Sequence, residues 1–569
     1  MGHRWKVFGA ACVAAMAMSS GAAQAHDPEQ GGTLLQDPFG KNFWFYANHQ
    51  TAQNPFNGAN THLTSSDMAF WGDYAYVGDY GGFRIFDITL AKPVLVEDVR
   101  CYGPQGDPSV FDRNGDGDAD TLVLSVDAVL ASEACGAGPV SKSPTTGKYP
   151  AGAWEGVRVF DISDKENVQQ IATVYQDCGS HTNTLLPNPA GDSMYVLNSS
   201  YPLGEGPTCG PLGAQQGRKV NHGVVQVVEI PFGNPASGEG IKEKTELPVV
   251  YPGDKDGTYR PVSEQGLNAP LDDFLGCHDL SVFPGRGIVG AACAEQAQVW
   301  NIDAQTGLPD TANPRWAYDQ PNVDFWHSAT FSWDGKVANF IDESFGDGCP
   351  PVTTKTGGVG TEKKVWETGN MFFFDTASGR LHSEYRNPRA TNDQTSPTKN
   401  QYCSSHLGIT VPAKDRYLLV DAYYRGGSAV IDFSDPTKPK EIAFADLDGT
   451  NTWSAYTYPR HSGRHDTIPV YSNDGLSRNY GTLAAPRYPE AAYGFQRFEA
   501  EIGPTNVVGF DRLNPQLQER VIPTNIAPAQ SQRARAASRK RFRNPRTYAK
   551  PLRTAREGAV IRSARPFDK

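Results

Sequence analysis

The sequence lacks the features that mark several protein classes. After the apolar run from Val7 to Met18, no stretch approaches the roughly 20 apolar residues that span a bilayer. The chain has 58 Gly and 42 Pro in 569 residues, but they follow no strict Gly-X-Y period, which excludes collagen. It also contains no G-x-S-x-G, P-loop or H-E-x-x-H motif. The composition is that of a loop-rich globular protein.

The first 25 residues are typical of an export signal. Arg4 and Lys6 precede the apolar run, and Ala23-Gln24-Ala25 supplies a cleavage site of the A-x-A type. We therefore expect a secreted protein whose mature chain begins at His26.

Cysteine is scarce, at nine in 569 residues, and one of the nine, Cys12, lies in the predicted signal. The even number that remains predicts four disulfides in an oxidising compartment. Nearest-neighbour pairing, one of 105 possible connectivities, joins Cys101 to Cys135, Cys178 to Cys209, Cys277 to Cys293 and Cys349 to Cys403. Cys277 stands beside His278, and metal ligation by its thiolate is the alternative.

Charge is divided unevenly along the chain. The net charge is −11, yet residues 531–569 hold thirteen Lys or Arg and only two acids. This tail has almost no apolar period, so we expect it to be disordered, and solvated or bound to an anionic cell-surface polymer. Nucleic acid is not an expected partner of an exported protein.

A short apolar strand that ends in an acid or amide recurs seven times. It reads Arg84-Ile-Phe-Asp87 in its first copy, and its last residues are Asp87, Asp161, Glu229, Asn301, Asp375, Asp432 and Glu499. Strands rich in β-branched and aromatic residues surround each copy and are separated by Gly, Pro, Asn and Asp turns. Four strands per unit predict an all-β, seven-bladed β-propeller over residues 26–505, followed by an extension over 506–569. A β-sandwich pair or a solenoid is the alternative.

These strands resemble those of the secreted LVIVD-repeat family. The likeness rests on Phe160-Asp-Ile-Ser163, on Gly276-Cys-His-Asp279 and on Trp326-His-Ser-Ala-Thr-Phe-Ser-Trp-Asp-Gly335, within about residues 40–500. The resemblance implies a β-propeller and says little about activity.

Five histidines fall at one place in the repeat, the start of the first strand: His62, His181, His278, His327 and His406. The equivalent places in blades 2 and 7 hold Asp107 and a residue near Trp453. Because the first strand of a propeller blade lines the central channel, these imidazoles are expected to converge on the axis. Neutral imidazole suits Cu, Fe or Zn. In position alone the ring is similar to the metal sites of the selenium-binding protein and methanethiol oxidase group, the carotenoid oxygenases and nitrous oxide reductase.

Two other interpretations of the histidines stay open. Asp79, Asp342 and Asp421 end second strands 17, 15 and 15 residues after His62, His327 and His406. Such acids can tie a blade together through a His–Asp pair or orient metal ligands from the second shell. The histidines can also line a metal-free polar mouth that binds a small molecule.

Three long loops and one acidic turn complete the candidate sites. Loops over 128–156, 199–222 and 344–369 are expected to cover the histidine mouth. The acidic turn matches part of a calcium loop through Asp112, Asn114, Asp116, Asp118 and Asp120, but the position of the bidentate Glu is Val123.

The sequence therefore favours a secreted propeller that binds a transition metal through an axial histidine ring. Metal-dependent oxidoreduction is the activity this would support, and whether the protein is an enzyme stays open. The alternative is a non-catalytic extracellular scaffold that binds a protein or glycan.

Overall fold

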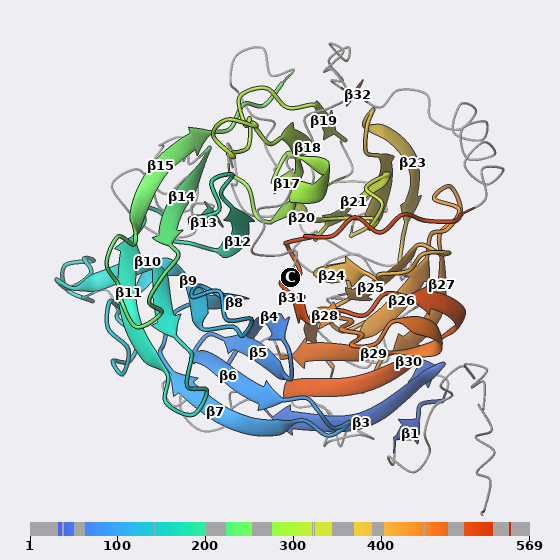
Figure 1. Ribbon diagram of the computed structural model, residues 1–569, viewed down its shortest axis with the longest axis horizontal. Helices are drawn as coiled ribbons and strands as arrows, with labels where there is room; N and C mark the ends of the chain where they lie inside the picture. Colours follow the sequence, from blue (N-terminus) through green and yellow to red (C-terminus); the bar gives the residue numbers. More distant parts are fainter. Residues whose placement is uncertain are drawn as a thin grey trace, which may run out of the picture.

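A computed structural model of the chain shows seven antiparallel sheets arranged around one axis (Figure 1). It describes residues 32–36, 39–50, 63–141, 143–200, 223–252, 276–320, 323, 325–343, 369–389, 403–447, 450–475, 494–526 and 546–547. The predicted signal lies outside these residues. So do most of the basic tail and most of two long loops, 199–222 and 344–369. Among the described residues no helix is both long and apolar enough to cross a membrane.

Each sheet is one blade, with strands in chain order from the axis outward. The blades are β4(Ser65–Trp71), β5(Tyr74–Asp79), β6(Gly82–Asp87), β7(Val94–Arg100); β8(Gln105–Phe111), β9(Thr121–Ser132), β10(Ala153–Asp161), β11(Gln169–Tyr175); β12(Thr182–Pro187), β13(Ser193–Ser199), β14(Val224–Pro231), β15(Lys242–Pro248); β16(Leu280–Phe283), β17(Ile288–Cys293), β18(Gln296–Asn301), β19(Trp316–Asp319); β20(Trp326–Phe331), β21(Val337–Asp342), β22(Met371–Asp375), β23(Arg380–Tyr385); β24(Gly408–Thr410), β25(Leu418–Ala422), β26(Ser428–Asp432), β27(Lys440–Ala445); and β28(Thr452–Tyr456), β29(Gly463–Asp474), β30(Gly494–Val507) with β3(Phe43–Gln50). The predicted seven-bladed propeller is confirmed.

The seventh blade joins the two ends of the ring. Its three inner strands come from the end of the propeller sequence, and its fourth, β3, comes from the beginning and pairs with β30. Three short strands each add a strand to the outer edge of one sheet. β1(Thr33–Leu34) pairs with β3, β2(Gly40–Lys41) with β27, and β32(Arg546–Thr547), inside the basic tail, with β19. Closure of this kind leaves few unpaired strand edges.

The recurring acid motif has a local physical cause. In five blades the third strand shifts register against the fourth just before its terminal acid, as between Ile85 and Phe86 ahead of Asp87. In the four of these blades whose third strand ends in Asp, the carboxylate accepts a hydrogen bond from a backbone N–H in the following turn, such as that of Thr89 at 2.8 Å. An Asp side chain favours such turns because it satisfies the amide that the strand leaves unpaired.

Side-chain hydroxyls tie the innermost strands of neighbouring blades together. Ser109 donates to the carbonyl of Asn183 at 3.2 Å, and Thr182 donates to that of His278 at 2.7 Å. Ser328 and Ser454 make the same contact with the next blade, at 2.8 and 3.0 Å. These bonds hold the starts of the inner strands at one level around the axis.

The segment after β30 closes one end of the channel, beyond the predicted boundary at residue 505. Its strand β31(Arg512–Leu513) pairs with β4 close to the axis (Figure 1). The amide of Asn514 accepts from the N–H of Val110 and donates to its carbonyl, both at 2.8 Å. Gln518 makes the same pair of bonds with Phe331, at 3.0 and 2.7 Å. Because Val110 and Phe331 lie at the ends of inner strands, this plug (residues 508–526) sits opposite the strand starts.

Candidate metal centre

Four of the predicted histidines lie where the innermost strands of four consecutive blades begin. His181 immediately precedes β12, His278 and His406 lie two residues before β16 and β24, and His327 is the second residue of β20. All four are buried, with exposed fractions between 1 and 4 %. The fifth, His62, lies outside the described residues.

The four rings form a continuous arc. Ring centroids are 4.3 Å apart for His181 and His278, 3.7 Å for His278 and His327, and 4.2 Å for His327 and His406. Trp453 of blade 7 continues the arc, 4.6 Å from His406. The structure thus brings together all four of the predicted ligand histidines that lie within the described residues.

Irregular strand pairing places several of the side chains at this level, His327 among them. The first and second strands shift register at this level in blades 1, 2, 5 and 7. His327 and Trp453 are the extra residues of two such bulges, and Asp67 and Asp107 lie inside the other two. A β-bulge re-aims a side chain that regular alternation would place elsewhere.

Three of the imidazoles are oriented by a hydrogen bond at Nδ1. His181 bonds a carboxylate oxygen of Asp127 at 2.9 Å, and His278 bonds one of Asp279 at 3.1 Å. Nδ1 of His406 lies 2.5 Å from the carbonyl oxygen of Trp453, which can only accept, so Nδ1 carries the hydrogen. That tautomer gives Nε2 of His406 the lone pair of a metal ligand. By contrast, neither ring nitrogen of His327 makes a hydrogen bond of normal geometry.

Burial keeps the rings of His278, His327 and His406 neutral. It lowers the pKa of His278 and His327 well below the usual value, and neighbouring imidazoles lower each further. Burial also lowers the pKa of His406 to about 3, against the opposing effect of the Trp453 carbonyl. Neutral imidazole is the form that binds a transition metal.

Buried carboxyl groups accompany the arc. Asp279 follows His278, and Glu343 accepts a hydrogen bond from the Tyr424 hydroxyl at 2.5 Å. Burial raises the pKa of Asp67 to about 6 and that of Asp107 and Asp279 well above the usual range. Asp107 and Asp279 are each affected by the charge of Asp67, so these acids share one region near the axis.

Two sets of three side chains bring their donor atoms within 4.8 Å of one another: His278, Asp279 and His327, and His327, Glu343 and His406. These are the groupings of that kind among the described residues. Their nitrogen and oxygen donors fit Cu, Fe or Zn.

The predicted second-shell acids Asp79, Asp342 and Asp421 contact groups other than the histidines. Asp79 lies 3.4 Å from Arg100 and accepts from the N–H of Gly81 at 2.7 Å. Asp342 accepts from the N–H groups of Phe325 and Gly369, at 3.1 and 2.8 Å. Asp421 accepts from the hydroxyl of Ser405 at 2.6 Å. A long-range His–Asp pair joins His181 to Asp127 of the preceding blade, so it links two blades and does not tie one blade together.

Several residues of the site were not predicted from sequence: Asp67, Asp279, Glu343 and Tyr424. The repeat pattern contained a signal for two of them, Asp279 and Asp67. Asp279 follows the channel-facing position of blade 4, and Asp67 and Asp107 occupy the matching place in blades 1 and 2. Glu343 and Tyr424 come from the ends of second strands, where spacing gave no indication.

Disulfides reinforce this end of the propeller. Cys101 is joined to Cys135, and Cys277 to Cys293, which confirms the pairing predicted for those four. Cys277 is therefore not a thiolate ligand. Cys178 and Cys403 are also in disulfides, and their predicted partners, Cys209 and Cys349, lie outside the described residues.

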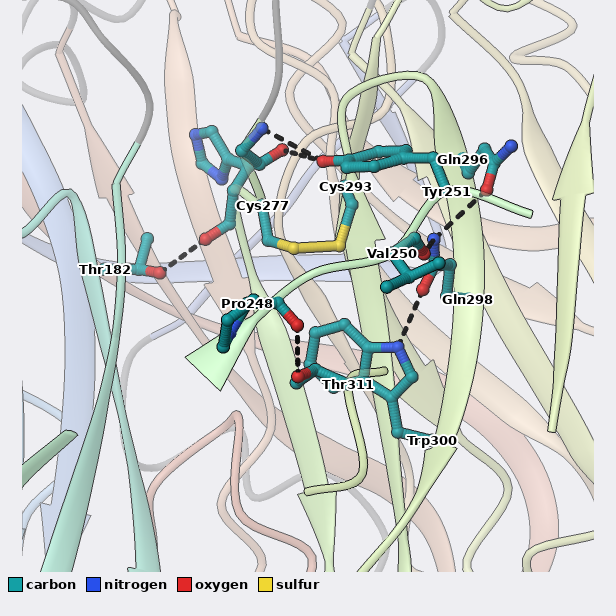
Figure 2. The surroundings of a disulfide bond; sticks show 12 residues. Thr182, Pro248, Val250, Tyr251, Cys277, Cys293, Gln296, Gln298, Trp300 and Thr311 are labelled. Carbon is teal, nitrogen blue, oxygen red and sulfur yellow. Dashed lines mark hydrogen bonds between the residues drawn. A yellow bond between two sulfur atoms is a disulfide. The ribbon is translucent and has the colours of Figure 1, made fainter. Parts of the chain in front are cut away.

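The Cys277–Cys293 disulfide lies in a polar network (Figure 2), and Cys277 directly precedes His278 in the chain. Thr182 bonds the His278 carbonyl, and the N–H of Gly276 donates to the hydroxyl of Tyr251 at 3.0 Å. Further out, Trp300 donates to Gln298 at 2.7 Å. The loop that carries His278 is thus held from both sides.

The loop over 128–156 lies at the histidine end, as predicted, because it follows directly after Asp127, the partner of His181. Its base is fixed by Arg158, which donates to the carbonyls of Ser132 at 2.5 Å and Tyr102 at 3.0 Å. The buried guanidinium thereby joins the insertion to the preceding blade.

The acidic turn lies between β8 and β9, at the plugged end of the channel. Asp112 accepts from the N–H groups of Gly115 and Gly117, at 2.6 and 2.8 Å. Asp120 accepts from those of Arg113 and Asn114, at 2.8 and 3.0 Å. Asn114, Asp116 and Asp118 continue the turn, with the N–H of Asp118 donating to Asp116. Calcium binding there stays a prediction.

Comparison with known proteins identifies the repeat. Residues 64–100, which include all four strands of blade 1, match the LVIVD repeat model. No curated protein matches the sequence. Two solved structures align with most of the chain. One is a candidate 6-phosphogluconolactonase from Bacteroides uniformis, with 10 % identity, a TM-score of 0.38, and 81 % of this chain and 100 % of that one covered. The other is the β-propeller domain of Cps50 (Swd1) from Myceliophteria thermophila. It has 9 % identity and a TM-score of 0.39, and the alignment covers 78 % of this chain and 99 % of that one.

The protein is a seven-bladed β-propeller that carries an LVIVD repeat. The assignment rests on the repeat match and the strand pairing, since the two structural alignments are too loose to support more. They do not address the positional similarity to the selenium-binding protein group, which stays a prediction.

Proposed function

We propose that this protein is an exported metal-binding propeller that holds Cu, Fe or Zn at its axial mouth and acts as an oxidoreductase on a small molecule there. The observation that carries the proposal is the arc of four buried imidazoles, with two carboxylates in reach of its donor atoms. His278, His327 and His406 are the proposed ligands, with Asp279 and Glu343, and His181 lies next along the arc.

The chemistry of the donors supports a borderline transition metal. The six described cysteines are all disulfide-bonded, so thiolates are not among the donors that the described residues offer. Imidazole nitrogen combined with carboxylate oxygen is a common set for Cu, Fe and Zn. A bound metal of this kind would supply Lewis acidity or electron transfer. The protein's part is to keep the rings neutral and fixed in direction.

Elemental analysis of the mature protein tests the proposal. The protein is purified without a His tag or chelator, and bound metal is measured by plasma mass spectrometry before and after reconstitution. We expect at least one Cu, Fe or Zn per chain, and a loss of most of it in His278→Ala. His461→Ala, which changes an exposed histidine at the opposite end of the propeller, should retain the full amount. Oxidase and oxygenase assays then follow with the loaded protein.

The absence of metal after reconstitution would refute this function and favour the non-catalytic scaffold. That alternative has its own support in the charge of residues 531–569, which suits an anionic cell-surface polymer. It predicts attachment to cells that weakens with salt and disappears when residues 531–569 are deleted. Attachment that persists without the tail would place the contact on the propeller.

A further inference from the structure

His327 differs from the other three histidines in its hydrogen bonding. His181, His278 and His406 each use Nδ1 to bond an oxygen atom. Both ring nitrogens of His327 are buried and make no hydrogen bond of normal geometry. A buried polar atom without a partner costs about 1–3 kcal/mol, so a ring with two such atoms calls for ligands on both.

His327 also stands between two separate groups of donors. Toward blade 4 lie His278, at 3.7 Å between ring centroids, and Asp279. Toward blade 6 lies His406, at 4.2 Å, with Glu343 from the end of β21. Each side completes a set of three donors within 4.8 Å, and His327 is the member that the two sets share.

Each of the two sets also contains one buried carboxyl group, Asp279 in the first and Glu343 in the second. A carboxyl group that binds a metal is deprotonated, and its buried negative charge needs a compensating positive charge. Two ions, one in each set, would compensate both carboxylates.

We propose that the axial site holds two divalent metal ions, Cu²⁺ or Zn²⁺, joined by the imidazole ring of His327. One ion is bound by His278, Asp279 and His327, and the other by His327, Glu343 and His406. When the second ion binds, it replaces the remaining N–H proton of His327, which is released to solvent, so that the ring bridges as an imidazolate. This inference rests on the proposed metal-binding function and adds the number of ions and the bridging residue.

Titration with copper tests the proposed metal-binding function and the proposed two-ion bridge separately. Metal-free protein is mixed with excess CuSO₄ and desalted, and its copper is counted by plasma mass spectrometry. We expect two ions per chain and an electron paramagnetic resonance signal that integrates to far fewer than two spins, because an imidazolate bridge couples neighbouring Cu²⁺ ions. One ion per chain would overturn the bridge and leave the proposed function intact. No ion would overturn both, and two ions with two full spins would overturn the bridge.

Matched variants test the assignment of donors. Asp279→Asn and Glu343→Gln should each lose one ion and restore a full one-spin signal from the other. His327→Gln should lose the coupling and at least one ion. Glu229→Gln, on the outer part of blade 3, and His461→Gln serve as controls and should bind two. Near-ultraviolet circular dichroism establishes that each variant is folded, and an Asp279→Asn protein that is folded and still binds two coupled ions would contradict the proposal.

Discussion

The two ends of the central channel are formed by the same seven inner strands and are finished in opposite ways. At the end where these strands stop, Asn514 and Gln518 of the plug bond backbone groups of Val110 and Phe331 through donor and acceptor alike. At the end where they start, imidazoles pack against one another, and His327 has no bonded nitrogen. An amide can satisfy both kinds of backbone group at once, so the plugged end is complete in itself.

The same contrast runs around the histidine end. Blades 3 to 6 contribute nitrogen donors at the first channel position, whereas blades 1 and 2 contribute Asp67 and Asp107 one residue later. The two sectors use adjacent positions at the start of the same inner strands. Substitution at these two repeated positions divides the mouth into an imidazole sector and a carboxylate sector. The proposed function assigns ligand binding to this end, where both ring nitrogens of His327 are buried without a hydrogen bond of normal geometry.

The largest expected effect concerns the plug. A chain ending at residue 507 loses Phe510, Leu513, Leu517 and Ile522, which are 3–5 % exposed. Burial of each such side chain contributes about 1.5–3 kcal/mol, or roughly 6–12 kcal/mol together, which is comparable to the whole stability of a typical protein. We expect this chain to lose its cooperative thermal transition. A chain ending at residue 530, which removes the tail alone, should melt like the full protein; equal melting of both would show that the plug does not stabilise the ring.

A smaller effect distinguishes the two described disulfides. Replacement of Cys277 and Cys293 by Ala opens a separation of 16 residues and should cost about 3 kcal/mol, and the pair at Cys101 and Cys135, separated by 34, slightly more. Only the first pair adjoins a proposed ligand, His278. We therefore expect metal retention to fall in the first double variant and to be kept in the second. Equal retention would mean that the strand alone positions His278.

The sequence sufficed for the fold and for part of the site. The acid at the end of each third strand repeats because every blade needs the same turn, so seven copies could be counted and the propeller predicted. The inner-strand histidines, from His181 to His406, shared a register and could be assigned to the channel for the same reason.

What the sequence could not provide depends on contacts between distant segments. The partner of His181 is Asp127 of the preceding blade, a pairing that spacing within one blade does not reveal. The plug has no repeat pattern, and its amides acquire partners only when the ring has formed. The pairing of β3 with β30, which closes the ring, joins segments more than 400 residues apart. A local sequence pattern therefore cannot predict it.

The last prediction concerns pH at the histidine end. Burial raises the pKa of Asp421 from 3.8 to about 8, against the hydrogen bond from Ser405. A carboxyl whose pKa is raised on folding stabilises the folded state in acid, and this contribution is lost as pH rises from about 4 to about 8.

Between pH 5 and pH 7 the loss is about 2–3 kcal/mol, at about 1.4 kcal/mol per pH unit. Because Asn does not titrate, the free energy of unfolding of Asp421→Asn should fall by that much less over this interval than that of the natural protein. Denaturant unfolding of the metal-free proteins at the two pH values measures the difference. Asp164→Asn, in an exposed turn, should follow the natural protein, and parallel profiles for all three would show that the Asp421 carboxyl ionises as freely as an exposed one.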